Sequence, residues 1–243
     1  MAGLDVIHQA IGLCEDCDLY QGRTNTVPGE GFPHADIMFI GEGPGLNEDK
    51  QGRPFVGAAG QFLNQLLGLI GLAREDVFIT NMVKCRPPNN RDPYPGETEA
   101  CAHYLEEQIG EINPKIIVPL GRHALARWFP NEPIGKLRAI PKQFGDLIVF
   151  PLYHPAAALH NGGLRTTIEE DFAKLGALLN RLTAAVPSPL IGIAGQEPDI
   201  TEPPFVPSPP SLPTTVAAEL RRDPESPPTP SALEPSAQQL NMF

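Results

Sequence analysis

The stretch from residue 35 to residue 55, ADIMFIGEGPGLNEDKQGRPF, most constrains how this chain can fold. Its apolar run IMFI at 37–40 is short and closed at once by glycine, which predicts a buried strand. Three glycines then alternate with Glu42 and Pro44, so the backbone turns sharply and can approach a ligand closely. Ligands bind at this end of a strand in open parallel α/β sheets. Taken alone, these residues also fit a glycine-rich loop that only turns.

Apolar runs and helical periodicities alternate along the rest of the chain. The patterns predict helices at residues 4–13, 58–70, 97–110, 121–129 and 166–183, and further strands at 76–82, 115–120 and 147–152. This alternation predicts an α/β fold with a mostly parallel sheet and helices on both faces. The polar ends of the strands then meet at one edge, which gathers Glu42, Asn81, His154 and the loop carrying Phe55.

Proline divides the chain into segments. Fourteen of the 29 prolines lie from residue 187 onward. Such a segment cannot bury enough apolar surface to offset the entropy of ordering. We therefore expect a globular domain at 1–186, a disordered proline-rich linker at 187–238 and a terminal peptide at 239–243.

The net charge of −11 argues against a protein that holds nucleic acid by bulk electrostatics. A local basic groove is still compatible with Arg86, Arg91, Arg122, Lys136, Arg138 and Lys142. The sequence shows neither a signal peptide nor an apolar run of membrane-spanning length, so we expect a cytoplasmic protein. We also expect it to be a monomer. In a reducing compartment, four cysteines are not expected to form structural disulfides.

The four cysteines favour a metal centre over inert buried thiols. They are Cys14, Cys17, Cys85 and Cys101. Four thiolates suit zinc or an iron–sulfur cluster. Zinc sites usually bring two close pairs, whereas this chain has one close pair and two distant cysteines. The pattern is more typical of a cluster that ties an N-terminal helix to a loop, and ligation alone implies no redox role.

Three side chains at the predicted strand ends could recognise a heterocyclic base. The Asn81 amide suits a ring edge that presents both N–H and C=O. Phe55 offers a flat face for stacking, and His154 can hydrogen-bond a carbonyl oxygen that gains negative charge as a bond breaks. Taken singly, they also fit a turn cap, a core residue and a structural histidine.

Together these features resemble a known family. The segments GEGPGLNEDKQGRPFVGAAGQFL, ITNMVKCRPPNNRDP and YHPAAAL, with the four cysteines, are similar to the family 4 (iron–sulfur) uracil-DNA glycosylases over nearly all of residues 4–182. The resemblance implies a three-layer αβα sandwich with a four-stranded, mostly parallel sheet. It also implies a [4Fe-4S] cluster on Cys14, Cys17, Cys85 and Cys101. The implied activity is to flip uracil out of single- or double-stranded DNA and hydrolyse its N-glycosidic bond, initiating base-excision repair of deaminated cytosine.

The resemblance also implies roles for single residues. Phe55 would stack on uracil, Asn81 would bond its N3 and O4 edge, and His154 would stabilise charge on O2. Contacts from Gly41, Glu42 and Gly43 and a gap-filling Leu159 complete the implied set. Related glycosylases that carry an aspartate in the first motif use it to orient water, whereas this chain has Gly43 there. Glu42 is the nearest candidate carboxylate.

The chain ends in Gln239, Leu240, Asn241, Met242 and Phe243. Apolar side chains at the end of a polar tether predict that this peptide binds in a groove of a partner protein. The peptide resembles the motif by which bacterial repair proteins bind the sliding clamp.

The main alternative for the whole chain is a non-catalytic iron–sulfur protein that binds DNA or transfers electrons. A nucleotide-binding enzyme is less favoured, because the glycine loop lacks a phosphate-binding motif.

Overall fold

The computed structural model describes residues 3–184. The predicted linker at 187–238 and peptide at 239–243 lie outside the described residues. The helices are α1 (Leu4–Leu13), α2 (Leu46–Gln51), α3 (Ala58–Leu69), α4 (Pro95–Ile112), α5 (Gly121–Ala126), α6 (Ile134–Leu137), α7 (Ala156–His160) and α8 (Leu164–Ala184). The strands are β1 (Glu30–Gly31), β2 (Ile37–Gly41), β3 (Phe78–Asn81), β4 (Ile116–Pro119), β5 (Lys142–Phe144) and β6 (Leu147–Val149).

The strands form one sheet in the order β1-β3-β2-β4-β6-β5. The central strands β3, β2, β4 and β6 are mutually parallel, and β1 and β5 pair antiparallel at the two edges. All five residues of β2 are buried, as expected for a strand covered on both faces.

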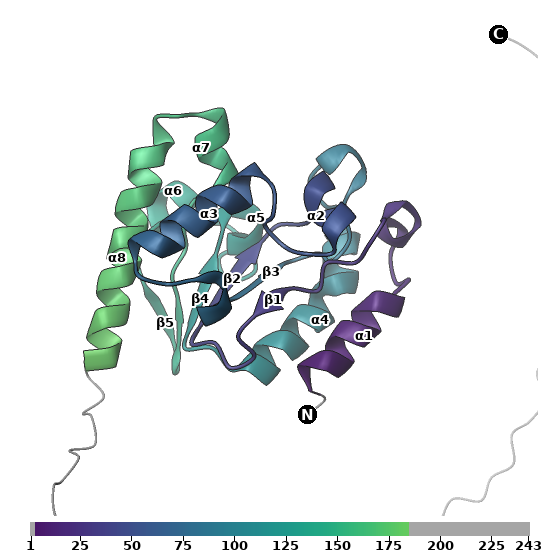
Figure 1. Cartoon of the computed structure of the whole chain (residues 1–243), viewed down its shortest axis with the longest axis horizontal. Helices are drawn as coiled ribbons and strands as arrows, with labels where there is room; N and C mark the ends of the chain where they lie inside the picture. Colours follow the sequence, from purple (N-terminus) through teal and green to yellow (C-terminus); the bar gives the residue numbers. More distant parts are fainter. Residues whose placement is uncertain (1–2, 185–243) are drawn as a thin grey trace, which may run out of the picture. The chain divides into compact units, whose positions relative to one another are not determined.

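Helices cover both faces of the sheet (Figure 1). Phe39 of β2 points to the face covered by α3 and α8, where its ring stacks on Phe172 with centroids 6.0 Å apart. Met38 and Ile40 point to the opposite face, where they pack with Leu105 of α4. Beyond α4 lies α1, which contributes Ile7 and Ile11 to a smaller apolar cluster. The alternation of side chains along β2 therefore builds two cores, one on each side of the sheet.

The predicted α/β class is confirmed, and all four predicted strands and all five predicted helices are present. The sheet has six strands rather than four, because the edge strands β1 and β5 are too short and too exposed to show an apolar pattern. The helix predicted at 121–129 ends at Ala126. In the described part of the chain, no helix is both long enough and apolar enough to cross a bilayer.

Candidate active site and cysteine cavity

A cavity of about 440 Å³ lies at the carboxyl ends of the parallel strands. Its lining residues are Glu42, Gly43, Pro44, Gly45, Glu48, Phe55, Ala59, Asn81, Pro87, Asn90, Arg91, Asp92, His154, Ala156 and His160. Five of the seven predicted substrate-binding residues are therefore in one cavity. Gly41 lies behind it, where a β-carbon would be 2.4 Å from Asn81 Oδ1. Leu159 is not among the lining residues; it is exposed on α7, next to the lining residue His160.

Asn81 is the last residue of β3 and is 2% exposed. Its Oδ1 atom is buried without a hydrogen-bond partner. A buried acceptor left unpaired is costly, so this atom calls for a ligand that donates an N–H. Lys84 Nζ donates to the Asn81 backbone oxygen at 2.8 Å, which fixes the strand end that carries the amide.

The ring of His154 is oriented by the turn that begins α7. The backbone N–H of Ala156 donates to His154 Nδ1 at 3.1 Å. Burial lowers the pKa of His154 to about 4, so the ring is neutral at pH 7. With Nδ1 accepting a hydrogen bond, the single ring proton lies on Nε2, which leaves a neutral donor for a carbonyl oxygen in the cavity.

The turn from 54 to 57 sets the position of Phe55. The phenyl ring is 6% exposed and stacks near His154, with centroids 5.4 Å apart. Phe55 has a positive φ of 51°, which non-glycine residues rarely adopt. Glu48 Oε1 accepts hydrogen bonds from the N–H groups of Val56 and Gly57, and Arg74 donates to the Phe55 oxygen at 3.0 Å. These contacts hold the strained turn. The sequence did not predict this role of Glu48, because no local pattern marks it.

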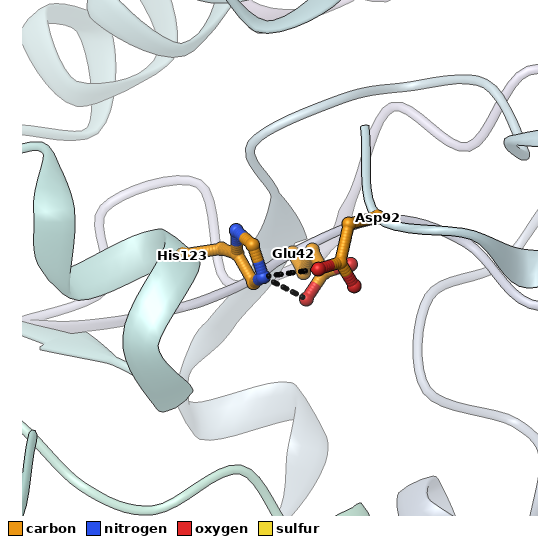
Figure 2. Close-up of side chains that lie close together, drawn as sticks. All are labelled: Glu42, Asp92 and His123. Atoms are coloured by element: carbon orange, nitrogen blue, oxygen red, sulfur yellow. Dashed lines mark ion pairs between the residues drawn. The ribbon is translucent and has the colours of Figure 1, made fainter. Parts of the chain in front are cut away.

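Glu42 lies beside Asp92 and His123, which come from the loop before α4 and from α5 (Figure 2). His123 Nε2 is 3.6 Å from Glu42 and 3.1 Å from Asp92. Burial, together with the Asp92 carboxylate, raises the pKa of Glu42. Arg122 Nε donates to His123 Nε2 at 2.9 Å, and its Nη2 pairs with Asp92 Oδ2 at 2.6 Å. The Arg122 guanidinium is thus bonded to His123 Nε2 and Asp92 Oδ2, two of the atoms that a metal ion would need here.

A second cavity is lined by all four cysteines. Ile11, Leu19, Val83 and Tyr104 supply apolar walls. Cys85 and Cys101 are buried, whereas Cys14 and Cys17 are partly exposed. Burial raises the pKa of Cys101 to about 11, and it also raises the pKa values of Cys17 and Cys85. A bound metal would deprotonate such thiols outright. Four convergent sulfur donors in an apolar pocket fit a thiolate-bound metal or cluster, as the sequence predicted.

Lys84 lines the cysteine cavity, bonds the backbone of Asn81 and is fully buried. Its Nζ donates to Thr80 Oγ1 and Gln108 Oε1 at 2.7 Å each, in addition to the Asn81 oxygen. Burial lowers the pKa of Lys84 to about 7. A lysine between Val83 and Cys85 carries no local signal of burial, and the sequence did not predict this role.

Three of the six basic residues that could form a local basic groove are engaged in ion pairs. Arg91 pairs with Glu97, Arg122 with Asp92, and Arg138 with the buried Asp171. Charges neutralised in this way contribute less to long-range attraction of DNA.

Comparisons with known proteins identify the superfamily of this chain. The model of the uracil DNA glycosylase superfamily matches residues 28–177, and the chain belongs to that superfamily. A type-4 uracil-DNA glycosylase of Sulfurisphaera tokodaii is 52% identical over 188 residues, covering 73% of this chain and 86% of the relative. One of Thermotoga maritima is 44% identical over 183 residues, covering 73% and 95%. A type-5 uracil-DNA glycosylase of Thermus thermophilus is 39% identical over 114 residues, covering 41% and 52%. The extent of the type-4 matches assigns the chain to that branch.

Proposed function

We propose that the cavity at the strand ends excises uracil from DNA. The chain is a uracil-DNA glycosylase, a hydrolase of N-glycosyl bonds that acts in DNA repair. The observation that carries the proposed site is the unpaired, buried Oδ1 of Asn81. Uracil presents an N3–H donor next to its O4 acceptor, which match the Oδ1 acceptor and the amide donor of Asn81.

His154 is proposed to stabilise the leaving group. Cleavage of the C1′–N1 bond leaves the electron pair on uracil, and much of the negative charge falls on O2. The neutral Nε2–H of His154 is already oriented by Ala156, so it can donate to O2 without reorganisation. Phe55 closes the cavity beside this ring and supplies a flat apolar face for the base.

Water completes the reaction at C1′, and Glu42 is the proposed residue that holds it. Glu42 lines the cavity, whereas Gly43 has no side chain to contribute. General-base catalysis typically contributes about 10²- to 10⁴-fold, so we expect Glu42 to matter less than the anion-stabilising contacts if it only positions the water.

We also propose that Cys14, Cys17, Cys85 and Cys101 hold a [4Fe-4S] cluster. The support is the convergence of four thiols in one apolar cavity. When bound, the cluster supplies iron–thiolate bonds that cross-link α1, the 83–85 segment and α4. The chain's own residues then carry the chemistry, with the cross-link ordering the loop that contributes Asn90 and Arg91 to the active cavity.

The remaining contacts with DNA are proposals of the same kind. Leu159 is 53% exposed beside the cavity and can fill the gap left by the flipped nucleotide in a duplex. We propose that the protein acts as a cytoplasmic monomer on uracil in single or double strands.

The test is single-turnover cleavage of oligonucleotides that hold one uracil, alone and opposite G or A. The wild type should cut, and Asn81→Ala and His154→Ala should each slow cleavage by about 10²- to 10³-fold. Circular dichroism and cluster absorbance of the variants should match the wild type. A cluster-loaded wild type that binds DNA without cutting it would refute the proposed activity.

The terminal peptide is proposed to bind a bacterial sliding clamp through Gln239, Leu240, Met242 and Phe243. The support is its sequence alone. Deleting residues 239–243 should leave excision from short oligonucleotides intact and abolish clamp pull-down. Undiminished pull-down by the truncated protein would exclude this role.

A further inference from the structure

Tyr94 exposes 60% of its surface just beyond the active cavity. The guanidinium carbon of Arg91 lies 3.7 Å from the centre of the tyrosine ring, a close cation–π contact. Arg91 also lines the active cavity. The Tyr94 ring therefore stacks on Arg91, and Arg91 is itself part of the cavity wall.

The pair is held rigidly by Glu97 at the start of α4. Arg91 donates to both Glu97 carboxylate oxygens, at 2.6 and 2.8 Å. Glu97 also accepts from the backbone N–H of Tyr94 at 2.7 Å, and prolines lie on both sides of Tyr94 in the chain. A ring fixed in this way loses little further conformational freedom when a ligand stacks on it.

The position of Tyr94 fits a strand of DNA that enters the active cavity. Arg91 and Asp92 form one wall of the cavity, and Ala156 and His160 of the α7 region also line it. A nucleotide next to the flipped uracil must pass over the rim of this cavity. With a net charge of −11, the chain as a whole repels phosphates, so contacts with bases gain importance.

We propose that the Arg91–Tyr94 pair is a stacking site for a nucleobase adjacent to the flipped uracil in single-stranded DNA. The proposal rests on uracil excision as the proposed function and adds a second base-binding position to it. Every base offers a flat face to an aromatic ring, so the site tolerates any neighbouring sequence. In a duplex the neighbouring bases stay paired and stacked on each other, which makes the site specific for unpaired strands.

The experiment measures binding separately from cleavage. Cluster-loaded, full-length protein is titrated into single strands that hold 2′-fluorodeoxyuridine, whose glycosidic bond resists cleavage, with 2-aminopurine on its 5′ or 3′ side. Stacking on Tyr94 should quench the fluorescence from one side only. Tyr94→Ala should abolish that quenching and weaken single-strand binding about tenfold, with less than a twofold change for duplex.

Two variants control for the fold and for general apolar contact. Tyr94→Phe keeps the ring and should retain the quenching and the affinity. Phe32→Ala removes another half-exposed aromatic, whose backbone N–H bonds the oxygen of Val77 at the opposite end of β3 from Asn81, and it should change neither.

Unchanged quenching and affinity in Tyr94→Ala would overturn the proposal, and so would equal losses for single strands and duplexes. Cleavage of the unmodified uracil oligonucleotide by the same wild-type preparation is followed in parallel. If the wild type does not cleave, the proposed function fails. If the wild type cleaves but quenches 2-aminopurine on neither side of the uracil, only the stacking site is refuted.

Discussion

The active cavity and the cysteine cavity share one short stretch of chain, residues 81–85, and have opposite character. Asn81 presents an unpaired amide oxygen to a cavity of about 440 Å³ whose walls carry both polar and apolar side chains. Four residues further on, Cys85 lies in a pocket closed by apolar side chains. The first cavity exposes an unpaired polar atom to a ligand, and the second buries two of its four sulfur donors, Cys85 and Cys101.

Residues that serve catalysis and residues that serve stability therefore lie only a few positions apart in the chain. An unpaired buried oxygen costs folding energy and is useful only when substrate binds. Thiols that converge from α1, α4 and the 83–85 segment are useful when they cross-link those elements. Substitutions at the first cavity should therefore change rates, and substitutions at the second should change the fold. Three experiments can break or sharpen this contrast.

The largest effect is expected for Cys101→Ser. Serine keeps the approximate size of the side chain and removes a thiolate ligand, so the proposed [4Fe-4S] cluster should be lost. Because metal binding contributes directly to folding, the melting temperature should fall by about 10 °C or more, and excision should fall with it. Visible absorbance and thermal denaturation measure the two effects.

His154→Ala is the matched control for Cys101→Ser. It should keep the absorbance and lose activity, because its ring lies in the other cavity. A folded, active Cys101→Ser protein would contradict the structural role of the cysteines.

Gly41→Ala should lower kcat by about 100-fold without loss of the cluster. The added methyl group would lie 2.4 Å from Asn81 Oδ1 and 2.7 Å from the Phe55 ring, so both must move. A displacement of about 1 Å at a reacting group can cost about 100-fold in rate. Gly68→Ala, on α3 with open space around it, should leave activity unchanged. Equal rates for Gly41→Ala and wild type would show that the amide position is not critical.

Much of this contrast could be predicted from the sequence. Buried strands followed by glycine or polar residues predict which side chains share a sheet edge. Four of the residues that line the cavity, Glu42, Phe55, Asn81 and His154, follow from that rule. The four cysteines predicted a common site by residue type alone.

The parts that sequence did not predict depend on contacts across long separations. Lys84 is buried because Gln108, 24 residues away, accepts from its ammonium group. Arg122 and His123 reach Asp92 from α5, and nothing near either segment marks the meeting. The edge strands also escaped prediction, since pairing with β3 and β6 defines them rather than any pattern of their own.

The smallest effect concerns the pH dependence of stability. Burial lowers the pKa of His154 to about 4, against 6.5 for an ordinary histidine. As pH falls from 6.5 toward 4, the unfolded chain binds a proton that the folded chain excludes, so the free energy of unfolding decreases. The neutral His154→Asn variant lacks this term and should lose about 1 to 3 kcal/mol less between pH 7 and pH 4.

Thermal denaturation of both proteins across this range measures the difference, and other titrating groups cancel because the two chains share them. Diverging curves would establish that His154 is neutral at pH 7. The leaving uracil anion would then be stabilised by an uncharged hydrogen-bond donor. Parallel curves would mean that His154 titrates at an ordinary pKa. The active cavity would then leave the pKa of His154 as it is in water, and Asn81 alone would distinguish this cavity from the cysteine cavity.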